Sequence, residues 1–107
     1  MTTWRYVGNP DFHDGHIRAV SRDIETVTVT VEGTSGKHYT VIFDGVTSLE
    51  SHLPKDMMLH ALSETELDTE SLRRYDFINW YVDEPKEEDS KAYLRITAKR
   101  FTLTVSE

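Results

Sequence analysis

Apolar and polar residues alternate with a period of two along much of this chain, which is the pattern of half-buried β-strands. In residues 26–33 valine alternates with threonine, and residues 33–36 are the turn-forming sequence Gly-Thr-Ser-Gly. Residues 37–44 then resume the alternation, with aromatic and aliphatic side chains on one face. This order predicts a β-hairpin over residues 26–44.

The middle of the chain holds a short apolar run followed by an acidic segment. Residues 57–62, Met-Met-Leu-His-Ala-Leu, form a short apolar run that fits either a buried strand or a short helix. We favour a strand, which places Met57, Leu59 and Ala61 on one face. Residues 63–70 hold four acidic residues and no basic one, so we expect a solvated loop there.

The C-terminal part again predicts strands. Residues 74–82 are aromatic on alternating positions, and both faces of this segment are expected to be covered. Residues 92–98 and 101–105 form a last pair, and we expect the final strand to pair inside a sheet. With about six to seven short strands, turns between them and at most one short helix, residues 1–107 are expected to form a single, mainly β domain: an antiparallel sandwich or barrel-like fold.

The amino-acid composition limits the classes of function that this chain can have. The chain contains no cysteine, which excludes disulfides, thiolate metal sites and cysteine nucleophiles. It has no apolar run long enough to span a bilayer and no apolar leader segment. We therefore expect a cytoplasmic protein that does not bind a membrane. Its net charge of −7 would repel a nucleic acid and suits a basic protein partner. The sequence pattern does not indicate an oligomeric state.

The densest polar cluster lies in residues 11–16, Asp-Phe-His-Asp-Gly-His. His13, Asp14 and His16 are ligand types for zinc, nickel or non-haem iron, and a metal-dependent enzyme using them is one alternative. Such a site needs both imidazoles to converge and a further ligand from elsewhere in the chain, for which His38, His52 and His60 are the candidates. The other interpretation is structural: Asp14 and Gly15 make a tight turn at the entry to a strand. Because no catalytic or cofactor-binding motif is present, we expect no cofactor and a binding domain rather than an enzyme.

Aromatic side chains supply the other candidate sites. Tryptophan and tyrosine are enriched where protein partners bind most tightly, although in a small domain such residues also build the core. A further alternative is a small-ligand pocket inside a barrel, lined by Tyr39, Phe43, Phe77 and Trp80. The candidate binding residues are Trp4, His13, Asp14, His16, Tyr75 and Trp80.

Residues 9–17, Asn-Pro-Asp-Phe-His-Asp-Gly-His-Ile, follow Trp4 and a glycine and precede an alternating strand pair. This Phe-His-Asp-small-x-aliphatic start resembles the small all-β immunity proteins of bacterial polymorphic toxin systems and related uncharacterised domains. A Phe-Asp-Gly-Val turn, a Met-Met-Leu segment and an acidic loop follow in the same order. The resemblance implies a non-enzymatic inhibitor that binds a protein toxin, with the segment Phe12-His13-Asp14 in a structural role. It also implies a strand at residues 57–62.

Overall fold

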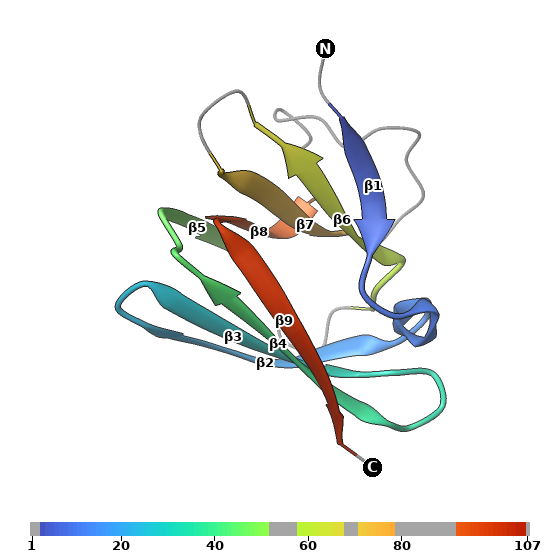
Figure 1. The fold of residues 1–107 in the computed structure, drawn as a ribbon. Coiled ribbons are helices and arrows are strands. Elements are labelled where there is room, and N and C mark those ends of the chain that lie inside the picture. Colours follow the sequence, from blue (N-terminus) through green and yellow to red (C-terminus); the bar gives the residue numbers. More distant parts are fainter. Residues whose placement is uncertain (1–2, 52–57, 68–70, 79–91, 107) are drawn as a thin grey trace.

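The protein is a two-layered antiparallel β structure in a computed structural model that describes residues 3–51, 58–67, 71–78 and 92–106 (Figure 1). One sheet has the strand order β1-β6-β7-β8-β5 and the other the order β2-β3-β4-β9. The elements are β1 (Trp4–Val7), the 3-10 turn η1 (Pro10–Phe12), β2 (His16–Asp23), β3 (Thr26–Glu32), β4 (His38–Asp44), β5 (Ser48–Ser51), β6 (Ala61–Glu66), β7 (Arg73–Ile78), β8 (Ala92–Ala98) and β9 (Arg100–Ser106).

The mainly β fold class predicted from the alternation is confirmed. The described residues hold nine strands rather than six to seven, because β1 and β5 are only four residues long and too short for an alternation to be evident. The η1 turn is the single helical element of the described part, and no helix there is long and apolar enough to cross a membrane.

The hairpin predicted over residues 26–44 is present as β3 and β4, which pair in register from Val27 opposite Phe43 to Glu32 opposite His38. The valines of β3 point into the space between the sheets and are fully buried. There they meet the apolar face of the other sheet, including Phe77 and Leu94. Burial of this alternating face is the main stabilising term of the fold.

Of two predictions for the middle of the chain, the strand at residues 57–62 is only partly right and the loop at residues 63–70 is wrong where it is described. Within residues 58–60 the structure has only an isolated bridge between Met58 and His16, and the continuous strand β6 begins at Ala61. Residues 63–66, which we expected in a loop, belong to β6. Glu64 can be buried there because the Tyr75 hydroxyl and the Arg5 guanidinium both donate hydrogen bonds to its carboxylate. Met57 lies outside the described residues.

The face of β6 and β7 that points away from the other sheet is also buried. Ser63 and Asp76 are each 0% exposed, and Ile78 is 1% exposed. Asp76 accepts hydrogen bonds from Arg74 at 3.2 Å and from Arg95 at 2.5 Å, so a buried carboxylate lies between two guanidinium groups. For the described part of residues 74–82, the prediction that both faces are covered is therefore confirmed.

The two sheets are joined where β4 passes into β5 and β8 passes into β9. The backbone N–H of Lys99 donates to the carbonyl of Asp44, and the N–H of Thr47 donates to the carbonyl of Thr97. A single residue, Lys99, separates β8 in one sheet from β9 in the other. Among the described strands β9 lies at the edge of its sheet, paired with β4, so the prediction that the final strand pairs inside a sheet is wrong for this part of the chain.

Candidate functional site: a cavity lined by two histidines

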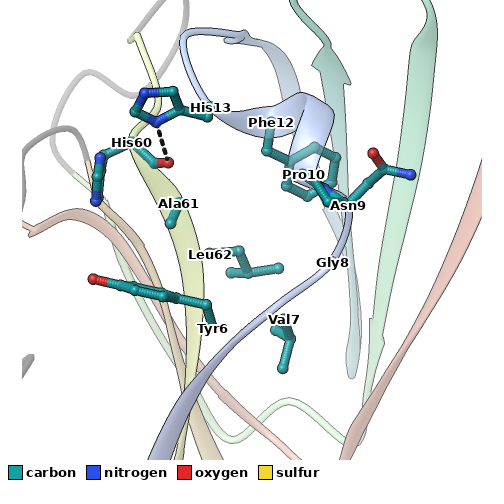
Figure 2. A pocket seen from close by; sticks show the side chains of 10 residues that line it. All are labelled: Tyr6, Val7, Gly8, Asn9, Pro10, Phe12, His13, His60, Ala61 and Leu62. Atoms are coloured by element: carbon teal, nitrogen blue, oxygen red, sulfur yellow. Dashed lines mark hydrogen bonds between the residues drawn. The ribbon is translucent and has the colours of Figure 1, made fainter.

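A cavity of about 320 Å³ opens where the end of β1, the segment around η1 and the start of β6 meet (Figure 2). We call it the histidine pocket. Tyr6, His60 and His13 follow one side of it, and Pro10 and Phe12 lie across from them. The complete lining consists of Tyr6, Val7, Gly8, Asn9, Pro10, Phe12, His13, His60, Ala61 and Leu62.

The loop after β1 is shaped by its own sequence. Gly8 has a φ of +86°, and a Cβ placed on it would lie 2.7 Å from the Phe12 ring, so this position requires glycine. Asn9 caps η1, because its side-chain oxygen accepts a hydrogen bond from the Asp11 N–H at 2.8 Å, and Pro10 starts the turn. Phe12 is 1% exposed and holds the loop against the core, where its ring meets Tyr39 edge-on.

Asp11 ties this loop to the turn between β3 and β4. Its carboxylate accepts hydrogen bonds from the Ser35 hydroxyl at 2.6 Å, the Ser35 N–H at 3.0 Å and the Tyr39 hydroxyl at 3.0 Å. The hydrogen bond from the Ser35 side chain is the largest cause that holds the pKa of Asp11 below its ordinary value, because it favours the charged form. One wall of the pocket is thus attached to the opposite sheet.

The Asp14-Gly15 turn expected from the sequence is present. Asp14 adopts a left-handed conformation with φ of +66°, and its N–H donates to the carbonyl of Leu59 at 2.8 Å. The N–H of Leu59 in turn donates to the carbonyl of Gly15, also at 2.8 Å. These bonds hold the segment that carries His60 beside the segment that carries His13.

Four rings form a continuous row: Tyr6, His60 and His13 line the pocket, and Trp4 extends the row along β1. Trp4 meets Tyr6 edge-on with 5.2 Å between ring centroids, Tyr6 meets His60 at 6.0 Å, and His60 meets His13 at 5.1 Å. We call these four residues the aromatic row. Tyr6 is 42% exposed and the side chain of His13 is 59% exposed, so the row presents ring faces and edges to solvent.

The polar contacts of His13 are local. Its Nδ1 lies 3.2 Å from the carbonyl oxygen of His60, to which it donates when it carries a proton, and its Nε2 lies 3.8 Å from the Asp14 carboxylate. Asp14 is itself 63% exposed. Both side chains remain in contact with water rather than in a closed, low-dielectric site.

The three metal candidates do not converge. His13 turns toward His60, whereas His16 begins β2 and lies opposite Glu32, whose carboxylate accepts a hydrogen bond from Arg18. Arg18 and, to a smaller extent, the neighbouring histidines His38 and His16 lower the pKa of Glu32. Over residues 3–51, 58–67, 71–78 and 92–106, no three histidine or acidic side chains are placed to hold one metal ion.

The predicted aromatic candidates fall in different places. Trp4 belongs to the aromatic row, whereas Tyr75 is 1% exposed and packs in the core against Phe43 and Phe101. Burial and the hydrogen bond to Glu64 raise the pKa of Tyr75, so its hydroxyl stays protonated. Trp80 lies outside the described residues.

The rings proposed to line a pocket inside a barrel are core residues where they are described. Tyr39, Phe43 and Phe77 are each at most 3% exposed, and the Phe43 and Phe77 rings meet edge-on at 5.9 Å. The histidine pocket lies elsewhere. Two of its key residues had only general signals in the sequence. Tyr6 is one of the tryptophan and tyrosine residues considered for an interface, and His60 is one of the histidines considered as a further metal ligand, but no pattern placed the two side by side.

Comparisons of the chain with protein-family models, with curated proteins and with solved structures gave no match. The features that bear on function are therefore the geometry of the histidine pocket and the charge of the chain.

Proposed function

We propose that this chain is a protein-binding domain that accepts a side chain of its partner in the histidine pocket. The observation that carries the proposal is the aromatic row at the exposed side of an open cavity. Tryptophan and tyrosine bury large areas at little entropic cost and are enriched at the centres of protein interfaces. A cavity of about 320 Å³ is near the lower end of the range for ligand sites, roughly 300–1,000 Å³, and suits one large side chain.

The charge of the chain indicates what kind of partner would bind. A net charge of −7 accelerates encounter with a basic surface and disfavours acidic ones. Asp14, 63% exposed beside His13, places a negative charge next to the aromatic row. A partner that inserts an apolar or aromatic side chain flanked by lysine or arginine would satisfy both features.

The most specific form of the proposal is immunity-type inhibition of a basic protein toxin. The resemblance of residues 9–17 to such immunity proteins supports it, and the acidic charge would suit masking of a phosphate-binding face such as that of a nuclease. The exposure of His13 and Asp14 supports binding over acid–base catalysis, which usually needs groups held in a cleft that shifts their pKa values.

The test is affinity capture from a lysate of the source organism on three columns that carry the unaltered domain, Tyr6→Ala or Ile24→Ala. Ile24 is 83% exposed in the turn between β2 and β3, so its substitution removes exposed apolar surface away from the pocket. We expect a basic protein to bind the columns that carry the unaltered domain and Ile24→Ala, and not to bind the Tyr6→Ala column. It should elute as the salt concentration rises. If it is a toxin, we expect its gene to lie beside the gene for this chain. Equal retention by all three columns, or no retention by the unaltered domain, would contradict the proposal.

A further inference from the structure

The four sheet edges formed by the described strands differ in how well they are protected against pairing with another strand. Edge strands expose unpaired backbone N–H and C=O groups, and soluble proteins protect them by shortness, bulges or charge. β1 and β5 have only four residues each. β2 is longer, but a register shift between Ile17 and Ala19 interrupts it, and Arg18, Arg22 and Asp23 place charges along it.

β9 has less of this protection, because its only charged residue is Arg100 at its start. It has seven residues, it pairs with β4 without a register shift, and its residues 101–105 include neither proline nor a charged side chain. Figure 1 shows β9 at the edge of its sheet with β4 beside it, and no described strand pairs with its other side. Val105 is 53% exposed on this strand.

The sequence of β9 is complementary to itself. Residues 101–105 read Phe-Thr-Leu-Thr-Val, a pattern that is symmetric about Leu103. If two copies pair antiparallel about that residue, Leu103 faces Leu103, and Phe101 faces Val105 of the second copy. Each Thr102 then faces Thr104 of the second copy, so apolar pairs lie on one face and hydroxyl pairs on the other.

We propose that β9 is a homodimerisation edge at which a second copy of this chain pairs antiparallel about a two-fold axis at Leu103. The two four-stranded sheets then join into one continuous sheet, and the outward backbone groups of β9 become hydrogen-bonded. Exposed Val105 is covered by Phe101 of the second copy. This inference concerns a different surface from the histidine pocket and does not depend on the proposed function.

The effect of salt concentration distinguishes dimerisation through β9 from binding of a basic partner at the histidine pocket. Two chains of net charge −7 repel one another, so screening should strengthen β9 pairing, whereas it should weaken binding of a basic partner. Sedimentation velocity of the full chain over a range of protein and salt concentrations is expected to show a monomer–dimer equilibrium that shifts toward dimer as salt rises. A chain that stays monomeric throughout this range would overturn the inference.

Charge substitutions at the edge provide the matched test. Thr102 and Thr104 are exposed, so T102K/T104K should leave the fold intact, as circular dichroism would check, and should abolish the dimer because lysine then faces lysine. Mixing this variant with T102E/T104E should restore a heterodimer. The control A19K/S21K places two lysines on exposed positions of the β2 edge and should dimerise like the unaltered chain. Loss of the dimer in the control, with retention in T102K/T104K, would overturn the assignment to β9.

The register can be tested separately because the chain contains no cysteine. A mixture of T102C and T104C chains should form the mixed disulfide faster than either chain forms a disulfide with itself, since only residues 102 and 104 face each other in the proposed pairing. Equal rates for the three products would contradict the two-fold axis at Leu103.

Discussion

Gly8 determines the shape of the histidine pocket through one contact. A side chain at this position would meet the ring of Phe12, which is 1% exposed and cannot move outward without opening the core. Gly36 is a matched control, because it has a similar positive φ of +93° but open space around it. The two positions therefore separate backbone strain from steric conflict.

We predict that Gly36→Ala costs about 1–2 kcal/mol, the cost of placing an L-residue in the left-handed region. Gly8→Ala should cost about 1–3 kcal/mol more, because the added methyl group also overpacks a buried site. The free energies of unfolding from urea titrations give both values. Equal losses in the two variants would show that the Phe12 contact does not constrain the loop.

Asp11 is predicted to make the loop around η1 sensitive to acid. Its pKa is held below the ordinary value of 3.8, chiefly by the Ser35 hydroxyl, so its folded form binds a proton less readily than the unfolded chain. The resulting stabilisation is present above about pH 3.8, the unfolded value, and is lost as pH falls through the lower folded pKa. We expect Asp11→Asn to lower the urea midpoint at pH 7.

The difference in midpoint between Asp11→Asn and the unaltered chain should shrink as the pH falls from 3.8 through the lower folded pKa of Asp11, because both proteins carry an uncharged group at this position once that pKa is passed. Urea titrations at several pH values measure it. A difference that stays constant down to the lowest pH would show that the carboxylate charge is not what stabilises the loop.

At the scale of elements, the central strands of the larger sheet depend on the buried carboxylate of Asp76. Removing it leaves two guanidinium groups of buried arginines, Arg74 and Arg95, without that counter-charge. We predict that Asp76→Ala destabilises the protein by about 3–5 kcal/mol, as is usual when one partner of a buried ion pair is removed.

Asp44 provides the comparison for this prediction. It lies 3.8 Å from Arg100, and both side chains are partly exposed, so Asp44→Ala should cost only about 0–1 kcal/mol. Thermal or urea unfolding of the two variants tests the contrast. Similar small losses in both would mean that Asp76 contributes little to the pairing of β7 with β8.

Strand alternation predicted the elements wherever one face is buried and the other is solvated. The valine–threonine pattern of β3 is the clearest case, and β4 and β9 follow the same rule. In β8 both faces are buried at Leu94, Arg95 and Ile96. The rule failed at β6, where Ser63, Glu64 and Thr65 are all buried. Glu64 is accommodated there by hydrogen bonds from its cross-strand partners Tyr75 and Arg5, and a sequence pattern carries no information about such partners.

In the whole molecule, the candidate site combines one segment that the sequence pattern identified with a distant segment that it did not connect to the first. The run of residues 11–16 marked His13 and Asp14, because a dense polar cluster with an Asp-Gly turn is visible in one segment. His60 is 47 positions away from His13 and approaches it only because Asp14 and Leu59 are hydrogen-bonded. The edge position of β9 was missed for a similar reason, since strand order follows from the crossing at Lys99 rather than from local pattern.

Binding at the histidine pocket can be mapped by NMR of the ¹⁵N-labelled domain during titration with the purified partner recovered by capture. The account predicts that amide signals of residues 6–13 and 60–62 shift or broaden first, while those of the β2–β3 turn around Ile24 remain unchanged. Perturbations confined to the β2–β3 turn or to β9, with residues 6–13 unaffected, would show that the histidine pocket is not the binding site.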